Sequence, residues 1–560
     1  MEGEQTTAES EQATLNSTQA RAVKGTQATG PPKWRSTRFQ LSYLILCGFA
    51  TILLQRVSFS MNIVCMVNHT ALDQQDNSRH STLTVSLLST QNGDGLRNQN
   101  SSFADGEKFG LALSNSSADG PFVWNKEMQG IVLGSVYWGL MITQLFAAYV
   151  FYYAGPKLVC GVCMAVMSLL SMLCHPASYW SPWAVFVLRL GMGICSSFTI
   201  PSMYAIWGKW APSGERSTLI IISFSGQHVA NAIVFPLSAL LCKYGFAGGW
   251  PSVFYVFGCL GLVWSVVWLV LVSDSPETHR RIHPDERDFI VNNRSAAFSR
   301  GDKVSVPWVK ILTSLCFWAL VAAHFAFTWG LYLFLSNLPL YMFEVMKFDI
   351  KSNGVYSMLP YVALWTSMVG GGFVSDCILR RKILSVFWSR RLFCAVSNII
   401  PAVLLLVMSY LGCNHVGAVM TLLILALGFT GFAYSGFLPN AFDMAPKFAA
   451  TIQSVDNSLA CLPGIITPYL VAELTKEKTR EQWQVVFFIT AGVFVFGTVF
   501  FCIFAKTSVQ SWALPAKTEL VEIDAEDIGN TVTDETTSYK DVSQNHAETN
   551  LLAQEYKSDA

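Results

Sequence analysis

Two arginines stand inside apolar stretches of this 560-residue chain. Arg56 interrupts the apolar run 39–66, and Arg189 lies near the start of the run 181–204. An unpaired charge inside a bilayer costs at least about 2.5–3.5 kcal/mol on insertion scales. Because a guanidinium can hold a carboxylate or phosphate through two parallel hydrogen bonds, we expect both residues to bind an anion. The alternatives are that Arg56 ties its helix to a backbone carbonyl or a buried acid, and that Arg189 extends to the membrane interface.

A second set of candidate residues lies in the apolar runs 312–338 and 449–472. Trp329 and Tyr332 come at about the same depth as the arginines, so a sugar ring or carbon skeleton could stack on them. Ordinary helix packing is the alternative for both. His324 and Asp456 are candidate coupling groups because each can exchange a proton, and an acid can also hold a cation. The alternatives are a hydrogen-bonded structural histidine, and an acid that caps a helix or pairs with an arginine.

A third candidate is the segment G-F-V-S-D-C-I-L-R-R at 372–381. It places Asp376 one turn before Arg380 and Arg381, at the end of an apolar run. An acid over a helix end that meets basic residues suits a gate latch, so we expect these three residues to control a conformational change rather than to bind a ligand.

The composition shows what must position these residues. Hydrophobic residues make up 52% of the chain and charged residues 13%, with a mean hydropathy of +0.39. A water-soluble protein has about a quarter of its residues charged, so lipid must cover much of this surface. Apolar segments long enough to cross a bilayer as helices recur along the chain. Twelve spans are expected, at 39–66, 128–150, 157–176, 181–204, 218–242, 250–272, 312–338, 353–379, 392–411, 415–438, 449–472 and 483–505.

The expected fold is therefore an all-α membrane protein with two six-helix bundles. A faint repeat supports the division, because Ala211-Pro212 is followed by Pro236 in the first half and Ala445-Pro446 by Pro468 in the second. Paired halves are typical of transporters with a site between the two bundles. The predicted parts are a cytosolic tail (1–38), the N-terminal bundle (39–272) with an outside loop (68–123), a cytosolic central loop (273–311), the C-terminal bundle (312–505) and a disordered cytosolic tail (506–560).

Charge predicts the orientation. Lys and Arg collect before the first span and after the eighth, which places both termini in the cytosol. The basic loop 476–480 opposes this rule, although nearby glutamates neutralise it. Three glycosylation motifs, at Asn68, Asn100 and Asn115, fall in the loop 68–123 and agree with an outside location. In the C-terminal tail, Glu548, Leu551 and Leu552 loosely resemble a dileucine signal for sorting adaptors.

Several function classes are not expected. The 37 basic and 37 acidic residues cancel, so no overall field favours nucleic acid. The 14 cysteines lie singly in apolar stretches, apart from Cys160 and Cys163, and predict neither a disulfide framework nor a metal site. No H-E-x-x-H, G-x-S-x-G or P-loop motif occurs, so we expect no enzyme and no cofactor.

The segment 372–381 resembles the loop signature of the major facilitator superfamily. Further motifs are similar to solute carrier family seventeen, the organic anion and phosphate transporters that include sialin, the vesicular glutamate transporters and the sodium/phosphate cotransporters. They are W-x-x-W-A-P-x-x-E-R-S at 207–217, the segment 124–144 and E-Q-W-Q-V-V-F-F-I at 481–489. The run A-H-F-A-F-T-W-G-L-Y at 323–332 resembles the sialin branch most.

The resemblance implies alternating access, with Arg56 and Arg189 matching the family's arginines in spans one and four. It also implies substrate-site roles for Tyr332, Ser435 and Asn440. Two departures limit what the resemblance implies. Met192 and Ser196 stand where sialin-like sequences have glutamates associated with proton coupling, which leaves the coupling ion open between a proton and sodium. Leu133 and Phe327 replace a histidine and an arginine of the glutamate carriers, which argues against a dedicated glutamate carrier.

The expected function is secondary active transport of a small organic anion, such as an acidic sugar or acidic amino acid, across a lysosomal, synaptic-type vesicle or plasma membrane. Sodium-coupled phosphate or organic anion transport at the plasma membrane is one alternative, and a membrane sensor without flux is another.

Overall fold

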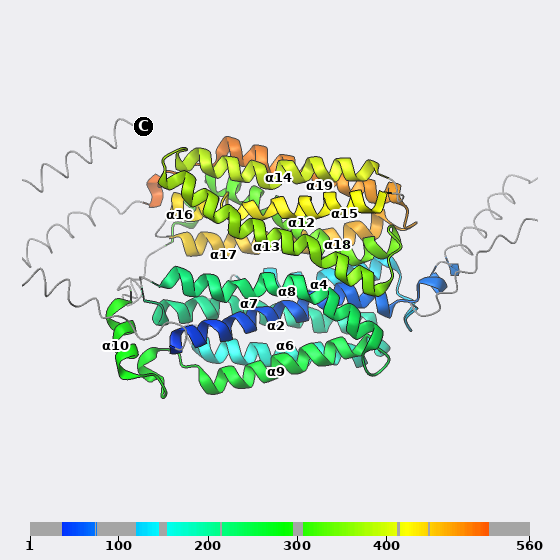
Figure 1. Ribbon diagram of the computed structural model, residues 1–560, viewed down its shortest axis with the longest axis horizontal. Coiled ribbons are helices and arrows are strands. Elements are labelled where there is room, and N and C mark those ends of the chain that lie inside the picture. The colour runs from blue at the N-terminus through cyan, green and yellow to red at the C-terminus, as the bar shows by residue number, and fades with distance from the viewer. Residues whose placement is uncertain are drawn as a thin grey trace, which may run out of the picture.

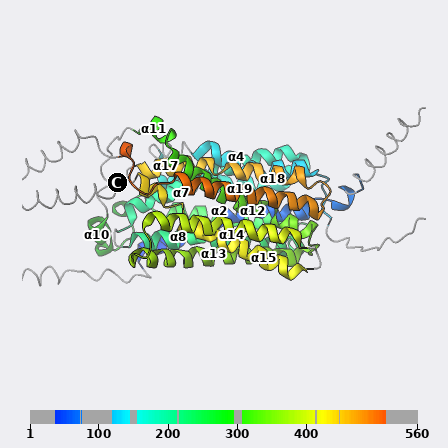
Figure 2. The same cartoon turned by 90° about the horizontal axis from the view of Figure 1, so that it is seen from above.

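The computed structural model describes residues 36–72, 74–75, 119–144, 154–212, 215–294, 306–411, 415–445 and 448–513. Figure 1 shows two layers of long helices, with the N-terminal half below the C-terminal half. Figure 2, turned by 90°, shows that the helices of both layers run along one common direction. We call the end that holds residues 36 and 513 the termini end, and the end at which α2 and α12 finish the opposite end.

In the described part of the N-terminal half, six long helices lie at the places the apolar runs predict. They are α2 (Thr37–Met66), α4 (Lys126–Gln144), α6 (Pro156–Trp180), α7 (Pro182–Trp210), α8 (Arg216–Tyr244) and α9 (Pro251–Leu271). The expected second span, 128–150, continues past Gln144 into residues outside the described part of the chain. Short helices follow in the central loop: the 3₁₀ turn η2 (Pro276–Thr278), α10 (Pro284–Asn293) and α11 (Trp308–Leu312).

The C-terminal half repeats the arrangement with two interrupted spans. Its unbroken helices are α12 (Leu315–Glu344), α13 (Ile350–Arg380), α14 (Val386–Tyr410) and α19 (Arg480–Phe504). The tenth span comprises α15 (Val416–Thr430), the 3₁₀ turn η5 (Gly431–Tyr434) and α16 (Asn440–Met444). The eleventh consists of α17 (Ala449–Leu459) and α18 (Leu462–Leu474), with a break that the prediction of one span over 449–472 missed.

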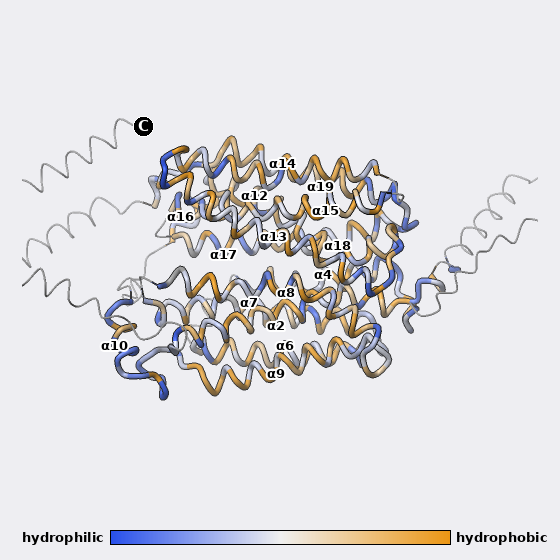
Figure 3. Tube along the Cα trace, in the orientation of Figure 1, coloured by the Kyte–Doolittle hydropathy of each residue, from blue (hydrophilic) through white to orange (hydrophobic). Residues whose placement is uncertain are grey.

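Hydropathy follows the expected membrane pattern. Hydrophobic residues line the middle of the helices and polar residues collect at both ends of the bundle (Figure 3). In the described part, ten helices are long and apolar enough to cross a membrane, and α4 and the α17–α18 pair fall in the two remaining predicted spans. The apolar windows of α12 and α2 are 78% and 72% buried, against 17% for α13. The central helices are therefore α2 and α12, which contact each other across the two halves.

The sequence repeat corresponds to a structural one. Ala211 directly follows α7 and Ala445 directly follows α16, each with its backbone N–H bonded to the carbonyl four residues earlier, at 3.0 and 3.2 Å. Pro236 lies inside α8 and Pro468 inside α18. The two halves therefore use the same helix-end device at corresponding points of the chain.

The central loop is tied to the N-terminal half through Arg38. This side chain is fully buried, and its guanidinium pairs with Glu215 at 2.7 Å and with Glu286 of α10 at 3.1 Å. Glu286 also accepts hydrogen bonds from the backbone N–H groups of Thr37 and Arg38. The acid therefore caps the start of α2, where unpaired N–H groups favour a negative charge.

After α19 the chain stays on the C-terminal half over residues 506–513. Gln510 donates its backbone N–H to the Met444 carbonyl at 2.8 Å, and Trp512 packs against Phe448. The prediction of disorder from residue 506 is therefore wrong for these first residues. The rest of the predicted tail, with Leu551 and Leu552, lies outside the described residues.

Candidate functional site

Arg56 lies between the two halves of the bundle. Its guanidinium carbon is 5.5 Å from the centre of the Tyr137 ring of α4, and the Tyr332 hydroxyl of α12 is within its hydrogen-bonding reach. The Tyr137 and Tyr332 rings contact each other, with centroids 4.5 Å apart. Helices of both halves therefore supply the surroundings of this cation.

The Arg56 guanidinium has unused hydrogen-bonding capacity. Its Nε is buried and has no hydrogen-bond partner, and no acid pairs with Arg56 among the residues the structure describes. A buried donor without a partner costs free energy, and more so when it is charged. The arrangement can accept an anion, which would supply both the missing acceptor and the countercharge.

Arg189 is buried, and part of its hydrogen-bonding capacity is already taken up within the protein. Its side chain is 2% exposed, its Nε donates to the Val132 carbonyl of α4 at 3.0 Å, and its guanidinium carbon lies 4.2 Å from the centre of the Phe59 ring. The alternative that Arg189 extends to the membrane interface is therefore wrong. The Arg189 guanidinium is close enough to Arg56 for the two positive charges to repel each other. The sequence placed both arginines at a similar depth in the membrane.

Sequence reasoning missed Tyr137. It lies within the segment 124–144, which we compared with a family motif as a whole without singling out this residue. Tyr137 is 4% exposed and is the residue that contacts both Arg56 and Tyr332. The sequence did hold a clue to Tyr137, because it places a phenol on an apolar helix and a buried hydroxyl usually needs a hydrogen-bond partner.

The structure does not bring the remaining predicted ligands to this group. Trp329 donates its Nε1–H to the Thr490 hydroxyl of α19 at 3.3 Å and is 7% exposed. This environment matches the alternative of ordinary helix packing. Asn440 is buried and donates to the Lys506 carbonyl at 3.1 Å, toward the termini end. Ser435 accepts through its carbonyl from Arg390 at 3.0 Å. None of these bonds, in the part of the chain described, links them to Arg56.

The two predicted coupling residues contact each other. His324 Nδ1 of α12 lies 2.6 Å from Asp456 Oδ2 of α17. Gln453 Nε2 donates to the same carboxylate oxygen at 3.2 Å. The alternative that Asp456 pairs with an arginine is wrong, because the titratable side chain that it contacts is this histidine.

Lys126 joins the two halves at the opposite end. Its ammonium lies 2.8 Å from the Glu344 carboxylate at the end of α12 and donates to the Thr475 carbonyl at 2.5 Å. The Lys126 and Glu344 side chains are only 10% and 2% exposed. We call Lys126, Glu344 and Thr475 the opposite-end clasp, since α4 belongs to one half and its partners to the other.

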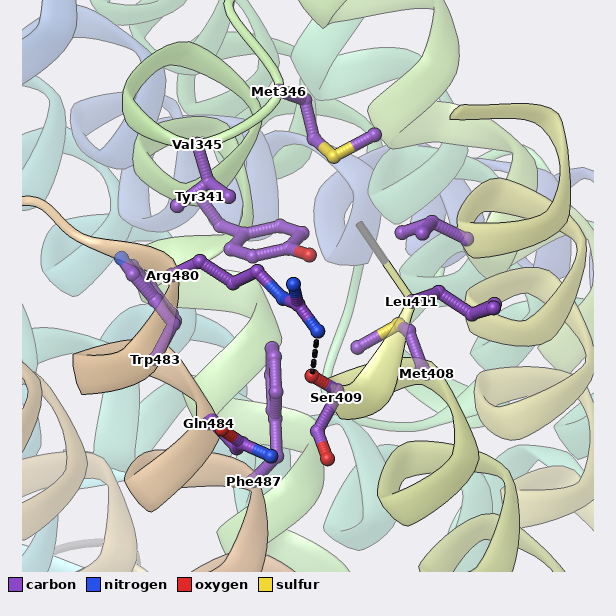
Figure 4. Close-up of a pocket in the computed structure, with 11 residues that line it drawn as sticks. Tyr341, Val345, Met346, Met408, Ser409, Leu411, Arg480, Trp483, Gln484 and Phe487 are labelled. Atoms are coloured by element: carbon purple, nitrogen blue, oxygen red, sulfur yellow. Dashed lines mark hydrogen bonds between the residues drawn. The ribbon is translucent and has the colours of Figure 1, made fainter. Parts of the chain in front are cut away.

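The basic loop 476–480 has partners at this same end. Lys476 pairs with Glu473, and this hydrogen bond, followed by attraction to Glu473 and to Glu127 of α4, raises the pKa of Lys476. Arg480 donates to the Ser409 carbonyl at 3.1 Å, as Figure 4 shows. These bonds give the loop a structural use despite its conflict with the charge rule.

The predicted latch residues Asp376, Arg380 and Arg381 are exposed at the termini end of α13. Within the described ranges none of them forms an ion pair. A neighbouring basic residue does, because Arg390 of α14 pairs with Asp443 of α16 at 2.9 Å. The latch role of Asp376 stays a prediction.

The predicted glycosylation sites lie at the opposite end or outside the described residues. Asn68 follows α2 directly and caps the next turn through its side-chain oxygen, which accepts from the Ala71 N–H at 2.8 Å. Asn100 and Asn115 fall in the segment that the structure does not describe.

Neither described pocket coincides with the Arg56 group. The one in Figure 4 lies between α12, α14, α15 and α19, and its accessible volume of about 10 Å³ is room for one water. A larger crevice of about 650 Å³ between α12, the α17–α18 pair and α19 is lined by Leu315, Trp318, Val321, Ala322, Phe325, Leu459, Leu462, Ile489, Gly492, Val493, Phe496 and Phe500. Such an apolar lining offers no charged group to an anion. Across the described ranges, no cluster of three metal-ligating side chains occurs either.

Known proteins resemble this chain over most of its length. A family model described as Major Facilitator Superfamily matches residues 44–468. Sialin from Ovis aries is 36% identical over 494 residues, covering 87% of this chain and 93% of sialin. Vesicular glutamate transporter 2 from Homo sapiens is 35% identical over 401 residues, covering 71% of this chain and 68% of the transporter.

A solved structure supports the fold. The crystal structure of a bacterial homologue of the human lysosomal transporter Spinster aligns with a TM-score of 0.57 and 13% identity, covering 85% of this chain and 98% of that one. The matched families are transporters and not enzymes. The chain is a multi-pass membrane protein of the Major Facilitator Superfamily and belongs, within it, to solute carrier family seventeen.

Proposed function

We propose that this transporter moves a small organic anion by alternating access of its two halves to the Arg56 group. The observation that carries the proposal is the Arg56 guanidinium, which lies between residues of both halves with a buried Nε that has no hydrogen-bond partner. The nearby charge of Arg189 supports it, because an anion would relieve the repulsion between the two cations.

The proposed substrate is an acidic sugar or an acidic amino acid. The tyrosines support a substrate with a carbon skeleton, since their rings give Arg56 an aromatic surround on which a ring or chain can pack. The names of the relatives, a sialin and a glutamate transporter, are compatible with this class.

We further propose a lysosomal or vesicular membrane as the location, with the termini end in the cytosol. The basic residues before α2 and after α13 support this orientation. The tail beyond residue 513 would then be available to sorting adaptors.

Purified protein in liposomes tests the proposal. Uptake of labelled sialic acid, glutamate, aspartate and phosphate is measured under separately imposed proton, sodium and voltage gradients. We expect saturable uptake of one organic anion, and a loss of at least about tenfold in Arg56→Gln, since a charge-assisted hydrogen bond contributes about 1.5–3 kcal/mol. Arg56→Lys should recover only part of the rate, because an ammonium lacks the planar fork.

The matched control is Arg287→Gln, which removes an exposed arginine of α10 and should transport normally. Normal transport by Arg56→Gln would remove this residue from the site. Uptake of phosphate alone would favour the phosphate carrier, and binding without uptake would favour a sensor.

A further inference from the structure

We propose that His324 and Asp456 form a single proton-binding site that couples proton movement to anion transport. The proposal rests on the proposed function, in that it names the co-transported ion. It goes beyond the sequence expectation, which treated the two residues as separate candidates.

The pair is built as one closed unit between two helices. Nδ1 and Oδ2 are 2.6 Å apart, and the two side chains are 7% and 0% exposed. Gln453 supports the same carboxylate oxygen, while the buried Oδ1 has no hydrogen-bond partner. A charge-assisted bond of this length fixes the histidine ring, which leaves Nε2 as the nitrogen that can exchange a proton.

In these apolar surroundings, the binding of one proton decides whether the pair carries a net charge. With a neutral imidazole, the ionised carboxylate leaves the pair at a net charge of minus one. A proton bound at Nε2 gives an imidazolium–carboxylate pair of net charge zero, which an apolar bundle tolerates better. No electron or other group is transferred.

The groups that face the pair are mostly uncharged. Phe327 and Phe437 lie next to the imidazole, with ring centroids 6.4 and 5.5 Å away. Gln453 and Asn457 of α17 are amides. Beyond these rings lie two titratable side chains, Tyr434, which touches Phe327, and His228 of α8, which touches Tyr434. Among the described residues, no further charged group pairs with either member.

The helix that carries Asp456 also joins the two halves. Ser454 and Ser458, two residues before and after Asp456, donate to the α4 carbonyls of Gln144 at 3.4 Å and Met141 at 3.0 Å. α17 ends at Leu459 and α18 begins at Leu462, so the span is interrupted just after Asp456. Interrupted helices of this kind commonly hold coupling ions. A change in the charge of the pair alters its bond to α12, and α17 passes that change to its contact with α4.

Proteoliposomes carrying wild type, Asp456→Asn and His324→Gln test the coupling. The probe is whichever labelled organic anion the wild type takes up, with internal pyranine reporting proton movement. We expect a proton gradient to drive at least tenfold accumulation in wild type and none in either variant, while both variants still exchange labelled for unlabelled anion. Asp456→Glu should regain part of the gradient response, and Asp288→Asn, at an exposed acid of α10, should behave as wild type.

Three outcomes would overturn the proposal. They are proton-driven accumulation that persists in both variants, wild-type uptake that follows only sodium, and wild-type uptake that follows only voltage. The last two would leave anion transport itself intact.

If the wild type neither takes up nor exchanges any probe, the proposed function fails and a substrate-free measurement decides on the proton site. Infrared difference spectra between pH 8 and pH 4 should then contain histidine and carboxylate bands that vanish in both variants. Spectra identical in wild type and variants would overturn the site.

Discussion

Arg56 and Arg189 are both arginines of the N-terminal half inside apolar helices, but their described partners differ. Arg189 donates its Nε–H to the Val132 carbonyl and lies over the Phe59 ring, so it ties α7 to α4 and to α2. Arg56 has aromatic neighbours and an unused Nε. We infer that Arg189 mainly positions the helices and adds positive charge, whereas Arg56 is the residue free to bind an anion.

The tie made by Arg189 depends on a glycine. At Gly193 a Cβ would overlap the backbone carbonyl of Val136, which cannot move without moving α4. Gly193→Ala should therefore separate α4 from α7 and destabilise the protein by about 1–3 kcal/mol, the usual range for overpacking. The measurement is the thermal midpoint of the purified protein, followed by size-exclusion chromatography.

The matched control for this substitution is Gly492→Ala, in α19. A Cβ at Gly492 meets no atom within 4 Å, so its thermal midpoint should stay unchanged or rise slightly. An equal midpoint for both alanine variants would show that α4 and α7 can separate at little cost.

Among the elements, α4 connects the two halves most completely. It packs against α7 within its own half and against α17 and α18 of the other half. At the opposite end, a Cβ at Gly130 would overlap the Pro468 carbonyl, so the two backbones lie in close contact there. The clasp of Lys126 with Glu344 and Thr475 lies beside this contact, so the two halves are closed together at the opposite end.

Breaking the clasp should loosen that closure. Lys126→Met removes the ammonium that pairs with the buried Glu344 carboxylate, and removal of one partner of a buried ion pair costs about 3–5 kcal/mol. Glu344→Gln should also destabilise, and the double variant should lose about 0.5–3 kcal/mol less than the sum of the two. Chemical denaturation of the four proteins in detergent measures this cycle.

Lys310→Met is the control, because Lys310 is an exposed lysine of α11. Strictly additive losses in the cycle would mean that the two side chains do not stabilise each other. The clasp would then not hold the halves together.

At the scale of the whole molecule, the ends of the long loop are pinned together at the opposite end. Asn68 donates its N–H to the Phe122 carbonyl at 2.7 Å, and Phe122 donates to Met66 at 3.1 Å. The Asp119 carboxylate accepts from the His69 N–H at 3.0 Å. The described chain therefore leaves and re-enters the bundle at one point. The location of the loop 68–123 on the outer side of the membrane stays a prediction.

Enzymatic deglycosylation tests that side. Protein from cells should lose mass on treatment, and the triple variant Asn68→Gln, Asn100→Gln, Asn115→Gln should run at the treated mass without treatment. Each single variant should lower the apparent mass of the untreated protein by the mass of one glycan. Wild type that keeps its mass on treatment would contradict the outside location of the loop.

The sequence predicted the elements well because a membrane helix is a local property. A run of about 20 apolar residues satisfies its backbone internally and faces lipid, so its position depends on composition alone. The predicted span 312–338 and α12 (Leu315–Glu344) differ by only a few residues. The break at Ala460 and Cys461 was missed, although Pro463 at the start of α18 and the adjacent Gly464 are a local signal for a new helix.

The candidate residues were recognised from the free-energy cost of placing them in an apolar helix, not from the residues that they contact. Arg56, Arg189, His324 and Asp456 stand out because a charged or titratable group is expensive in an apolar helix. The sequence by itself therefore determined which side chains need partners, along with the number of spans and the family motifs. Only the tertiary structure decided which partners they have, because His324 and Asp456 are 132 positions apart and Lys126 and Glu344 are 218 apart. Such pairs form only when the two halves pack, and no local pattern of residues encodes that packing.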